Sequence, residues 1–194
     1  MNIYDFDGTI YDGDSCKDII LYGLKTHPMK TIKALKKANK LNHDYKKELI
    51  PFERVKETML SFIFEIDNYQ EFINDFVNSH MNKIKPWYSE RKTDNDVILS
   101  ASYELWLNVF AQKLGIKYVI GTKVDDDGKI IGKNCKSEEK ISRFRSLYPK
   151  ASIDSSYSDS KADEPILQIA NNGYVVEGND IIPYKREYKF KNVK

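Results

Sequence analysis

The chain has 194 residues, enough for one sizeable domain or for a core domain that carries an insertion. Its 41% hydrophobic and 31% charged residues are typical of a globular protein. The 31 basic and 29 acidic residues leave a formal charge of +2, so no global positive field exists to attract nucleic acid or a membrane surface. We therefore expect no nucleic-acid partner.

The two cysteines, Cys16 and Cys135, cannot form a disulfide framework, and neither lies at a zinc-ligand spacing from the three histidines. We therefore expect a reducing, cytoplasmic location. The first predicted strand begins at residue 2, which leaves no room for a signal peptide, and no apolar run is long enough to cross a bilayer. Stable membrane insertion is not expected, and the oligomeric state stays open.

Residues 2–4 predict a short β-strand, and two carboxylates one residue apart, Asp5 and Asp7, follow it directly. Side chains alternate along a strand, so both would overhang the carboxyl end of the sheet, where open α/β sheets bind ligands. Two carboxylates this close repel each other unless a cation such as Mg²⁺ lies between them. Gly8 and Thr9 would then offer backbone N–H groups to an anion.

Amphipathic helices dominate the region between residues 14 and 85. The predicted helices cover residues 15–27, 29–41, 51–63 and 69–84. The second is rich in lysine, but no aromatic side chains are interleaved for base stacking, which favours a solvated face over a nucleic-acid site. His80 lies inside the apolar stripe of the fourth helix, which favours a packed core residue over a ligand.

From residue 95 the pattern alternates between strands and helices, which is typical of a mostly parallel sheet. Strands are predicted at residues 97–99, 117–120, 152–157 and 174–176, and helices at residues 103–114, 137–148 and 163–170. Residues 123–131 predict a hairpin, and its acidic run, 125–127, indicates turn chemistry because it lacks the spacing of a calcium-binding loop. The basic tail, 185–191, is expected to be a surface segment or an edge strand.

Ser100 and Ala101 follow the buried strand at residues 97–99, where a helix is expected to begin. A phosphate at this point would receive the Ser100 hydroxyl and the Ala101 N–H group, aided by the helix dipole. The alternative is that Ser100 only caps the helix.

The segment DFDGT at residues 5–9 resembles the first motif of the haloacid dehalogenase-like (HAD) phosphohydrolases, and SAS at residues 100–102 resembles the second motif of their phosphoserine-phosphatase-like branch. That branch also has a threonine after the next strand, a hairpin returning to a glycine, and a lysine opening the next helix. The corresponding positions here are Thr122, Asp127-Gly128, Gly132 and Lys140.

Lys140 thus matches the third-motif lysine, whose ammonium would offset charge on the nucleophile and on phosphoryl oxygens. Lys136 is a nearby competitor, but its spacing fits the family less well. Asp159 matches the metal-ligand aspartate of the fourth motif, and Asp163 matches the acidic residue that supports the metal shell. Ser158 replaces the usual glycine there, and Asp163 could alternatively be only a helix cap.

The resemblance implies an α/β fold with a Rossmann-like, mostly parallel HAD-like sheet. Residues 1–13 and 86–194 would form this core, and residues 14–85 would form an inserted four-helix cap of the C1 type.

The resemblance also implies a Mg²⁺-dependent phosphatase that hydrolyses a small phosphorylated metabolite. Asp5 would attack phosphorus to form an aspartyl phosphate, and Asp7 would protonate the leaving oxygen and then activate water. Asp5, the Asp7 backbone carbonyl and Asp159 would bind Mg²⁺, with Asp163 behind them. The anion clamp would consist of Ser100, Ala101 and Lys140.

Substrate choice should lie with the cap, where Asp14 and Arg54 are the candidate substrate-binding residues. Phosphoserine phosphatases have a glutamate at the position of Asp14, and a shorter acid reaches less far. They also have a cap arginine seven residues after a phenylalanine, and counting from Phe52 gives Met59, so Arg54 is displaced. Phosphoserine itself is therefore not expected. The lack of a membrane anchor disfavours lipid phosphates, although an amphipathic cap could touch a surface.

Two other functions fit the same residues. A phosphotransferase or mutase would pass the phosphoryl group from the aspartate to an alcohol instead of water. A non-catalytic binding module would be expected to have lost at least one catalytic group, yet all five are present: Asp5, Asp7, Ser100, Lys140 and Asp159.

Overall fold

The computed structural model describes residues 1–190 and contains a six-stranded sheet in the order β3-β2-β1-β4-β5-β6. Its first five strands are parallel, and β6 pairs antiparallel with β5 at one edge. The predicted α/β fold class is confirmed. The strands are β1 (Asn2–Tyr4), β2 (Asp96–Tyr103), β3 (Tyr118–Thr122), β4 (Ser155–Ser158), β5 (Asn172–Glu177) and β6 (Asp180–Pro183).

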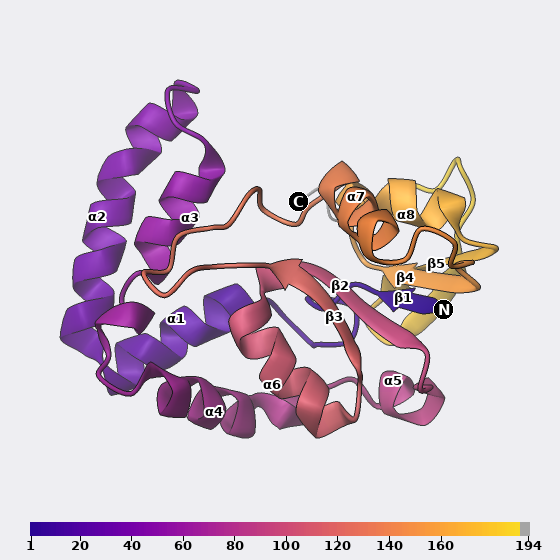
Figure 1. The fold of residues 1–194 in the computed structure, drawn as a ribbon, viewed down its shortest axis with the longest axis horizontal. Coiled ribbons are helices and arrows are strands. Elements are labelled where there is room, and N and C mark those ends of the chain that lie inside the picture. The colour runs from indigo at the N-terminus through magenta and orange to yellow at the C-terminus, as the bar shows by residue number, and fades with distance from the viewer. Residues whose placement is uncertain (191–194) are drawn as a thin grey trace.

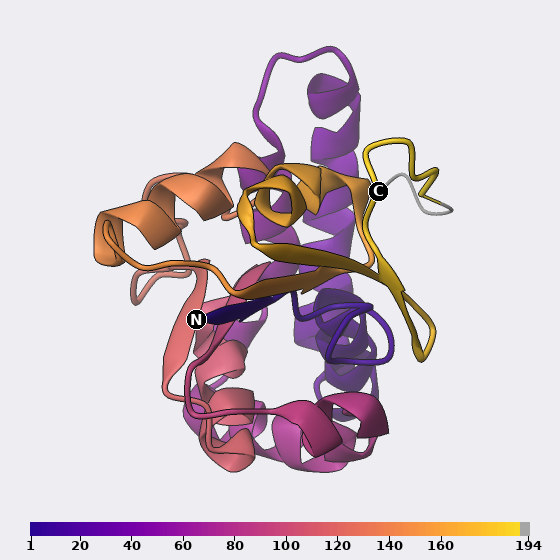
Figure 2. The same ribbon diagram turned by 90° about the vertical axis from the view of Figure 1, so that its right-hand side faces the viewer.

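Helices cover both faces of the sheet (Figures 1 and 2). In both views α7 and α8 lie on one face and α6 lies on the other, while α2 and α3 form a hairpin that extends beyond the sheet (Figure 1). The helices are α1 (Ser15–Thr26), α2 (Pro28–Lys46), α3 (Phe52–Leu60), α4 (Tyr69–His80), α5 (Pro86–Arg91), α6 (Glu104–Leu114), α7 (Glu138–Leu147) and α8 (Glu164–Ile169).

Side chains of the central strand alternate between two apolar cores. Ile3 belongs to a cluster with Phe144 of α7 and Ile166 of α8. Tyr4 points to the opposite face and belongs to the cluster that contains Trp106 of α6. A parallel strand covered on both faces must be apolar on both, which explains why the pattern before Asp5 is continuous rather than alternating.

The inserted helices share one hydrophobic core with the sheet domain. Phe76 of α4 is fully buried, and its ring lies 6.1 Å from that of Phe110 of α6 in an edge-to-face arrangement. Phe110 also contacts Phe6, directly after the central strand, at 5.0 Å between ring centroids. The insert is therefore packed onto the core through α4, and the α2–α3 hairpin is its projecting part (Figure 1).

Several elements differ from the prediction. The fourth helix ends at His80 rather than 84, and a 3₁₀ turn follows. His80 is half-buried against Phe76, as a packed residue would be. The hairpin at 123–131 contains a single β-bridge rather than two strands. In the tail, residues 185–190 form no strand, and Lys191 lies outside the described residues.

Two short elements were not predicted. Helix α5 has six residues, too few for a periodic pattern, and is held by the burial of Trp87 and Tyr88. Strand β6 ends in Pro183, and proline is tolerated there because β6 is an edge strand. Within residues 1–190 no helix combines the length and apolarity that a bilayer crossing requires.

The shared core makes a prediction about stability. Phe76→Ala should lower the free energy of unfolding by about 3–5 kcal/mol, because it opens a cavity between α4 and α6. Phe52→Ala, at a position that is 42% exposed, is the matched control and should cost less than about 1 kcal/mol. Urea unfolding followed by far-ultraviolet circular dichroism and by tryptophan fluorescence should give one coincident transition. Two separate transitions would show that the insert does not depend on this core.

Candidate active site

The order of the strands brings the predicted motifs together. β1 lies between β2 and β4, so the residues after β1 emerge beside Ser100 on one side and Asp159 on the other. A cavity of about 440 Å³ opens at this edge of the sheet, between the core and α1 and α3 of the insert. Eight predicted site residues line it: Asp5, Asp7, Asp14, Ser100, Ala101, Lys140, Asp159 and Asp163.

Lys140 forms the ionic centre of this cavity. Its Nζ donates hydrogen bonds to Asp5 Oδ1 at 2.8 Å and to Asp163 Oδ2 at 2.7 Å, and its side chain is only 4% exposed. Ser158 Oγ donates a further hydrogen bond of 2.7 Å to the same Asp163 oxygen. Lys136 lies on the cavity wall but is exposed. Of the two candidate lysines, Lys140 is therefore the one that lies between the carboxylates.

Burial raises the pKa of Asp5 well above its ordinary range, because the charged carboxylate loses its hydration. Lys140 opposes this shift, whereas the negative charges of Asp163 and Asp159 add to it. Burial by itself lowers the pKa of Lys140, but the two carboxylates outweigh it and the net shift is upward. The lysine therefore stays charged, and the carboxylates depend on it.

Asp7 is held by a separate network. Its Oδ1 accepts a hydrogen bond of 2.6 Å from the Ser15 backbone N–H, and its Oδ2 accepts one of 2.5 Å from Ser102 Oγ. The Ser15 and Ser102 hydroxyls are 3.0 Å apart, and Trp106 Nε1 donates to Ser15 Oγ at 3.0 Å. Burial raises the pKa of Asp7, and the Ser102 and Ser15 donors oppose the rise. The sequence prediction missed this role of Ser102, although the residue lies inside the SAS motif.

The turn after β1 corrects one prediction. The Gly8 N–H donates to the Tyr11 carbonyl at 2.9 Å and the Thr9 N–H donates to the Phe6 carbonyl at 3.3 Å, so the turn itself uses both groups and neither residue lines the cavity. They position Asp159 instead. Gly8 has φ +78°, and a Cβ there would lie 2.2 Å from Asp159 Oδ2. Thr9 Oγ1 accepts a hydrogen bond of 3.0 Å from the Asp159 N–H.

The helix expected directly after Ser100 begins later. Strand β2 continues to Tyr103, its register with β3 shifts between Leu99 and Tyr103, and α6 begins at Glu104. The expected help from the helix dipole is therefore wrong, and so is the alternative that Ser100 caps the helix. Ser100 Oγ instead accepts a hydrogen bond of 3.2 Å from the Ser102 N–H, inside the irregular part of the strand.

Lys56 of α3 is a buried cavity residue that the sequence prediction missed. Its Nζ donates to the Ala101 carbonyl at 2.7 Å and to Asn134 Oδ1 at 2.8 Å, and lies 4.7 Å from the centre of the Tyr103 ring. Burial lowers the pKa of Lys56. A possible signal was its position on the apolar stripe of α3, four residues after Phe52. Lys56 therefore connects α3 of the insert to strand β2 through a hydrogen bond.

Asp14 and Arg54, the two candidate substrate-binding residues of the insert, do not lie in the same place. Asp14 lines the cavity, but its side chain caps α1 by accepting a hydrogen bond of 3.0 Å from the Lys17 N–H. Arg54 has a side chain that is 57% exposed, lies 3.6 Å from Glu57, and is not among the cavity-lining residues. The structure therefore does not bring Asp14 and Arg54 together.

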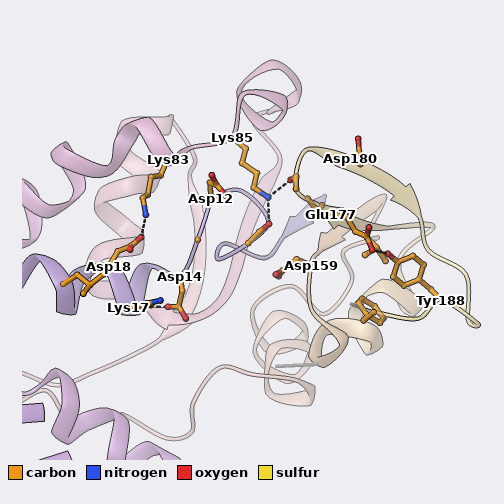
Figure 3. A pocket seen from close by; sticks show the side chains of 17 residues that line it. Asp12, Asp14, Lys17, Asp18, Lys83, Lys85, Asp159, Glu177, Asp180 and Tyr188 are labelled. Carbon is orange, nitrogen blue, oxygen red and sulfur yellow. Dashed lines mark hydrogen bonds and ion pairs between the residues drawn. The ribbon is translucent and has the colours of Figure 1, made fainter. Parts of the chain in front are cut away.

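A larger cavity of about 860 Å³ adjoins this one and shares Asp14, Lys17, Leu21 and Asp159 with it (Figure 3). Its side chains form ionic and polar contacts, such as Lys83 to Asp18 at 2.7 Å. Lys85 Nζ donates to the carbonyls of Gly8 and Gly178, which ties the turn after β1 to the β5–β6 turn (Figure 3). Its lining includes none of the four core groups Asp5, Asp7, Ser100 and Lys140, so the smaller cavity is the candidate active site.

Among the described residues, no group of three or more histidine, cysteine, aspartate or glutamate side chains is arranged to hold a metal ion. Asp7 and Asp163 direct their carboxylates to hydrogen-bond donors. Asp5 and Asp159 are the carboxylates that could hold a divalent cation, because they follow the neighbouring strands β1 and β4 and line the same cavity. With the Asp7 backbone carbonyl they would provide the oxygen donors that Mg²⁺ prefers.

The family model of haloacid dehalogenase-like hydrolases matches residues 3–168. The chain belongs to this family, as its four motifs predicted. Protein CicA of Caulobacter vibrioides is 37% identical over 82 residues, a stretch that covers 39% of this chain and 37% of CicA. The chain thus matches little more than a third of that relative's length.

Two solved structures share the fold. A protein of unknown function from Bordetella pertussis Tohama I superposes with a TM-score of 0.71 at 17% identity, over 89% of this chain and 87% of that one. A phosphoserine phosphohydrolase-like protein from Francisella tularensis gives a TM-score of 0.56 at 20% identity, over 89% and 86%. Both likenesses extend over the insert as well as the sheet, because each covers most of both chains.

The ionic centre predicts a pH-dependent effect on stability. Lys140→Met leaves two buried carboxylates without their counter-charge and should lower the free energy of unfolding by about 3–5 kcal/mol at pH 8. The loss should shrink towards pH 5, because burial raises the pKa of Asp5, and its carboxyl group needs no counter-charge once it is protonated. Urea unfolding at both pH values in metal-free buffer measures the difference.

The control for this prediction is Lys136→Met, which removes an exposed lysine from the wall of the same cavity. It should change the free energy of unfolding by less than about 0.5 kcal/mol at either pH. Equal losses for the two variants would contradict the assignment of Lys140 as the ionic centre.

Proposed function

We propose that the chain is a Mg²⁺-dependent phosphatase that hydrolyses phosphate monoesters through an aspartyl phosphate on Asp5. The observation that supports it most is the buried Lys140 ammonium between Asp5 and Asp163, in a cavity that Ser100 also lines. A buried positive charge beside a carboxylate nucleophile and a hydroxyl donor is suited to a dianionic phosphoryl group.

In the first step an Asp5 carboxylate oxygen attacks phosphorus, and the bond to the leaving alcohol oxygen breaks as Asp7 donates a proton to that oxygen. In the second step Asp7 removes a proton from water, and the water oxygen attacks the same phosphorus. Inorganic phosphate leaves and the Asp5 carboxylate is restored. The Ser15 and Ser102 hydrogen bonds hold Asp7 in one orientation through both transfers.

The proposed reaction also requires that the negative charge on Asp5 and the phosphoryl group be offset. Lys140 offsets the negative charge that accumulates on Asp5 and the phosphoryl oxygens, and Ser100 donates a hydrogen bond to one of those oxygens. Mg²⁺ held by Asp5, Asp159 and the Asp7 carbonyl would supply Lewis-acid stabilisation of the phosphoryl oxygens. Asp163 keeps Lys140 in place.

Asp5→Asn should keep the fold and abolish turnover of 4-nitrophenyl phosphate, because an amide oxygen cannot form the acyl phosphate. Release of 4-nitrophenolate measures turnover, and the thermal unfolding midpoint checks the fold. Residual turnover within about tenfold of wild type would exclude Asp5 as the nucleophile. Product analysis with added ethanol separates hydrolysis from transfer: ethyl phosphate in place of inorganic phosphate would indicate a phosphotransferase.

Chelation with EDTA should remove phosphatase activity, and added Mg²⁺ should restore it. Asp159→Ala should raise the Mg²⁺ concentration needed for half-maximal activity by at least about tenfold, because one of two carboxylate ligands is lost. Asp180→Ala, at the edge of the neighbouring cavity, is the matched control and should leave that concentration unchanged. Full activity in a metal-free preparation would contradict the role of Mg²⁺.

A further inference from the structure

The walls of the candidate active-site cavity differ in chemistry. The side formed by the sheet is polar and contains the residues of the proposed reaction. The side formed by the insert presents four apolar side chains, two from α1 and two from α3: Ile20, Leu21, Phe52 and Met59. These residues line the same cavity as Asp5, Ser100 and Lys140, so the alcohol part of a phosphate ester bound at Asp5 has this apolar side of the cavity available to it.

Two of these side chains are exposed despite their size. Leu21 is 51% exposed and Phe52 is 42% exposed. On α3 the cavity-lining residues Phe52, Lys56 and Met59 follow one another at helical spacing, so one continuous stripe faces the cavity. Apolar side chains exposed at the mouth of a cavity stabilise an apolar ligand by the area it removes from water.

Of the three charged groups that the insert places on this cavity, Asp14 and Lys56 are engaged in hydrogen bonds, and the third, Lys17, is an exposed lysine. Asp14 caps α1 through the Lys17 N–H, and Lys56 donates to the Ala101 carbonyl and to Asn134. Arg54, the other candidate for recognition of a charged substrate, is not among the lining residues. A substrate with an ammonium beside its phosphate would lose the hydration of that group here, where the one lining carboxylate of the insert, Asp14, already caps α1.

We propose that the substrate is a phosphate monoester of an apolar alcohol, with an alkyl or aromatic group that lies against Leu21, Phe52 and Met59. This inference rests on the proposed phosphatase function and names the substrate class of the same site. A free apolar phosphate and a lipid phosphate at a surface share this chemistry, since both place a hydrocarbon next to the phosphoryl group.

The test is a series of soluble monoesters, ethyl, butyl and hexyl phosphate, compared with phosphoserine and glycerol phosphate at saturating Mg²⁺. The value of kcat/KM should rise about twofold to fourfold for each added methylene, the upper limit corresponding to complete burial. Phosphoserine and glycerol phosphate should be poorer substrates than butyl phosphate. Dodecyl phosphate in phosphatidylcholine vesicles distinguishes a lipid phosphate at a surface from a free apolar phosphate. A kcat/KM above that of hexyl phosphate would indicate a lipid substrate. A lower kcat/KM would indicate a free metabolite.

Two variants test the wall directly. Leu21→Gln and Met59→Gln preserve approximate side-chain volume but add an amide, and each should reduce the gain in kcat/KM per methylene. Leu147→Gln is the matched control, because Leu147 is 57% exposed and lies outside the cavity. It should leave the dependence on chain length unchanged.

The outcomes separate the two proposals. If ethyl phosphate is hydrolysed but kcat/KM stays flat along the series, or phosphoserine is preferred, the apolar substrate class is wrong and the phosphatase stands. If no monoester is hydrolysed, the phosphatase is wrong. Calorimetry of ethyl and hexyl phosphate binding to the Asp5→Asn variant then tests the apolar wall alone. Tighter binding of hexyl phosphate supports the apolar substrate class, and equal binding of the two esters overturns it.

Discussion

The structure depends on one buried cation among converging carboxylates. Because β1 lies between β2 and β4, Asp5 and Asp159 emerge at adjacent strand ends, and Asp163 follows in the next turn. Such a cluster would repel itself in a desolvated cavity. Lys140 reaches it from α7, which is held against the sheet by the fully buried Phe144. The packing of α7 on one face of the sheet thus places the positive charge that offsets the repulsion among the carboxylates at the sheet edge.

Sequence reasoning succeeded where local pattern and topology determine position. The strand before Asp5, the alternation of strands and helices after residue 95, and Gly115 as the end of α6 all follow from local rules. Parallel strands place their carboxyl ends at one edge, so the convergence of Asp5, Ser100 and Asp159 on one cavity was predictable once the motifs were assigned to strand ends.

The failures have a common physical origin in tertiary context. Nothing local showed that β2 would continue irregularly past Ser100, or that the N–H groups of Gly8 and Thr9 would be used inside their own turn. Lys56 was missed because a lysine on an amphipathic helix usually reaches solvent, whereas here its acceptors, the Ala101 carbonyl among them, come from the core domain. Arg54 was chosen by residue type, and its direction on α3 could not be known without the packing of the α2–α3 hairpin.

Helix α1 connects the proposed chemistry to the proposed selectivity. Its first residue, Ser15, donates its N–H to Asp7, and Trp106 of the core holds the Ser15 hydroxyl. Ile20 and Leu21, about one and a half turns further along the same helix, form part of the apolar wall. One element therefore supplies both a donor that orients the proposed acid and two side chains of the apolar wall. The Lys140 ammonium of the phosphoryl clamp comes from α7, on the other side of the cavity from the insert, so the sequence of α1 can vary at Ile20 and Leu21 without changing that charge.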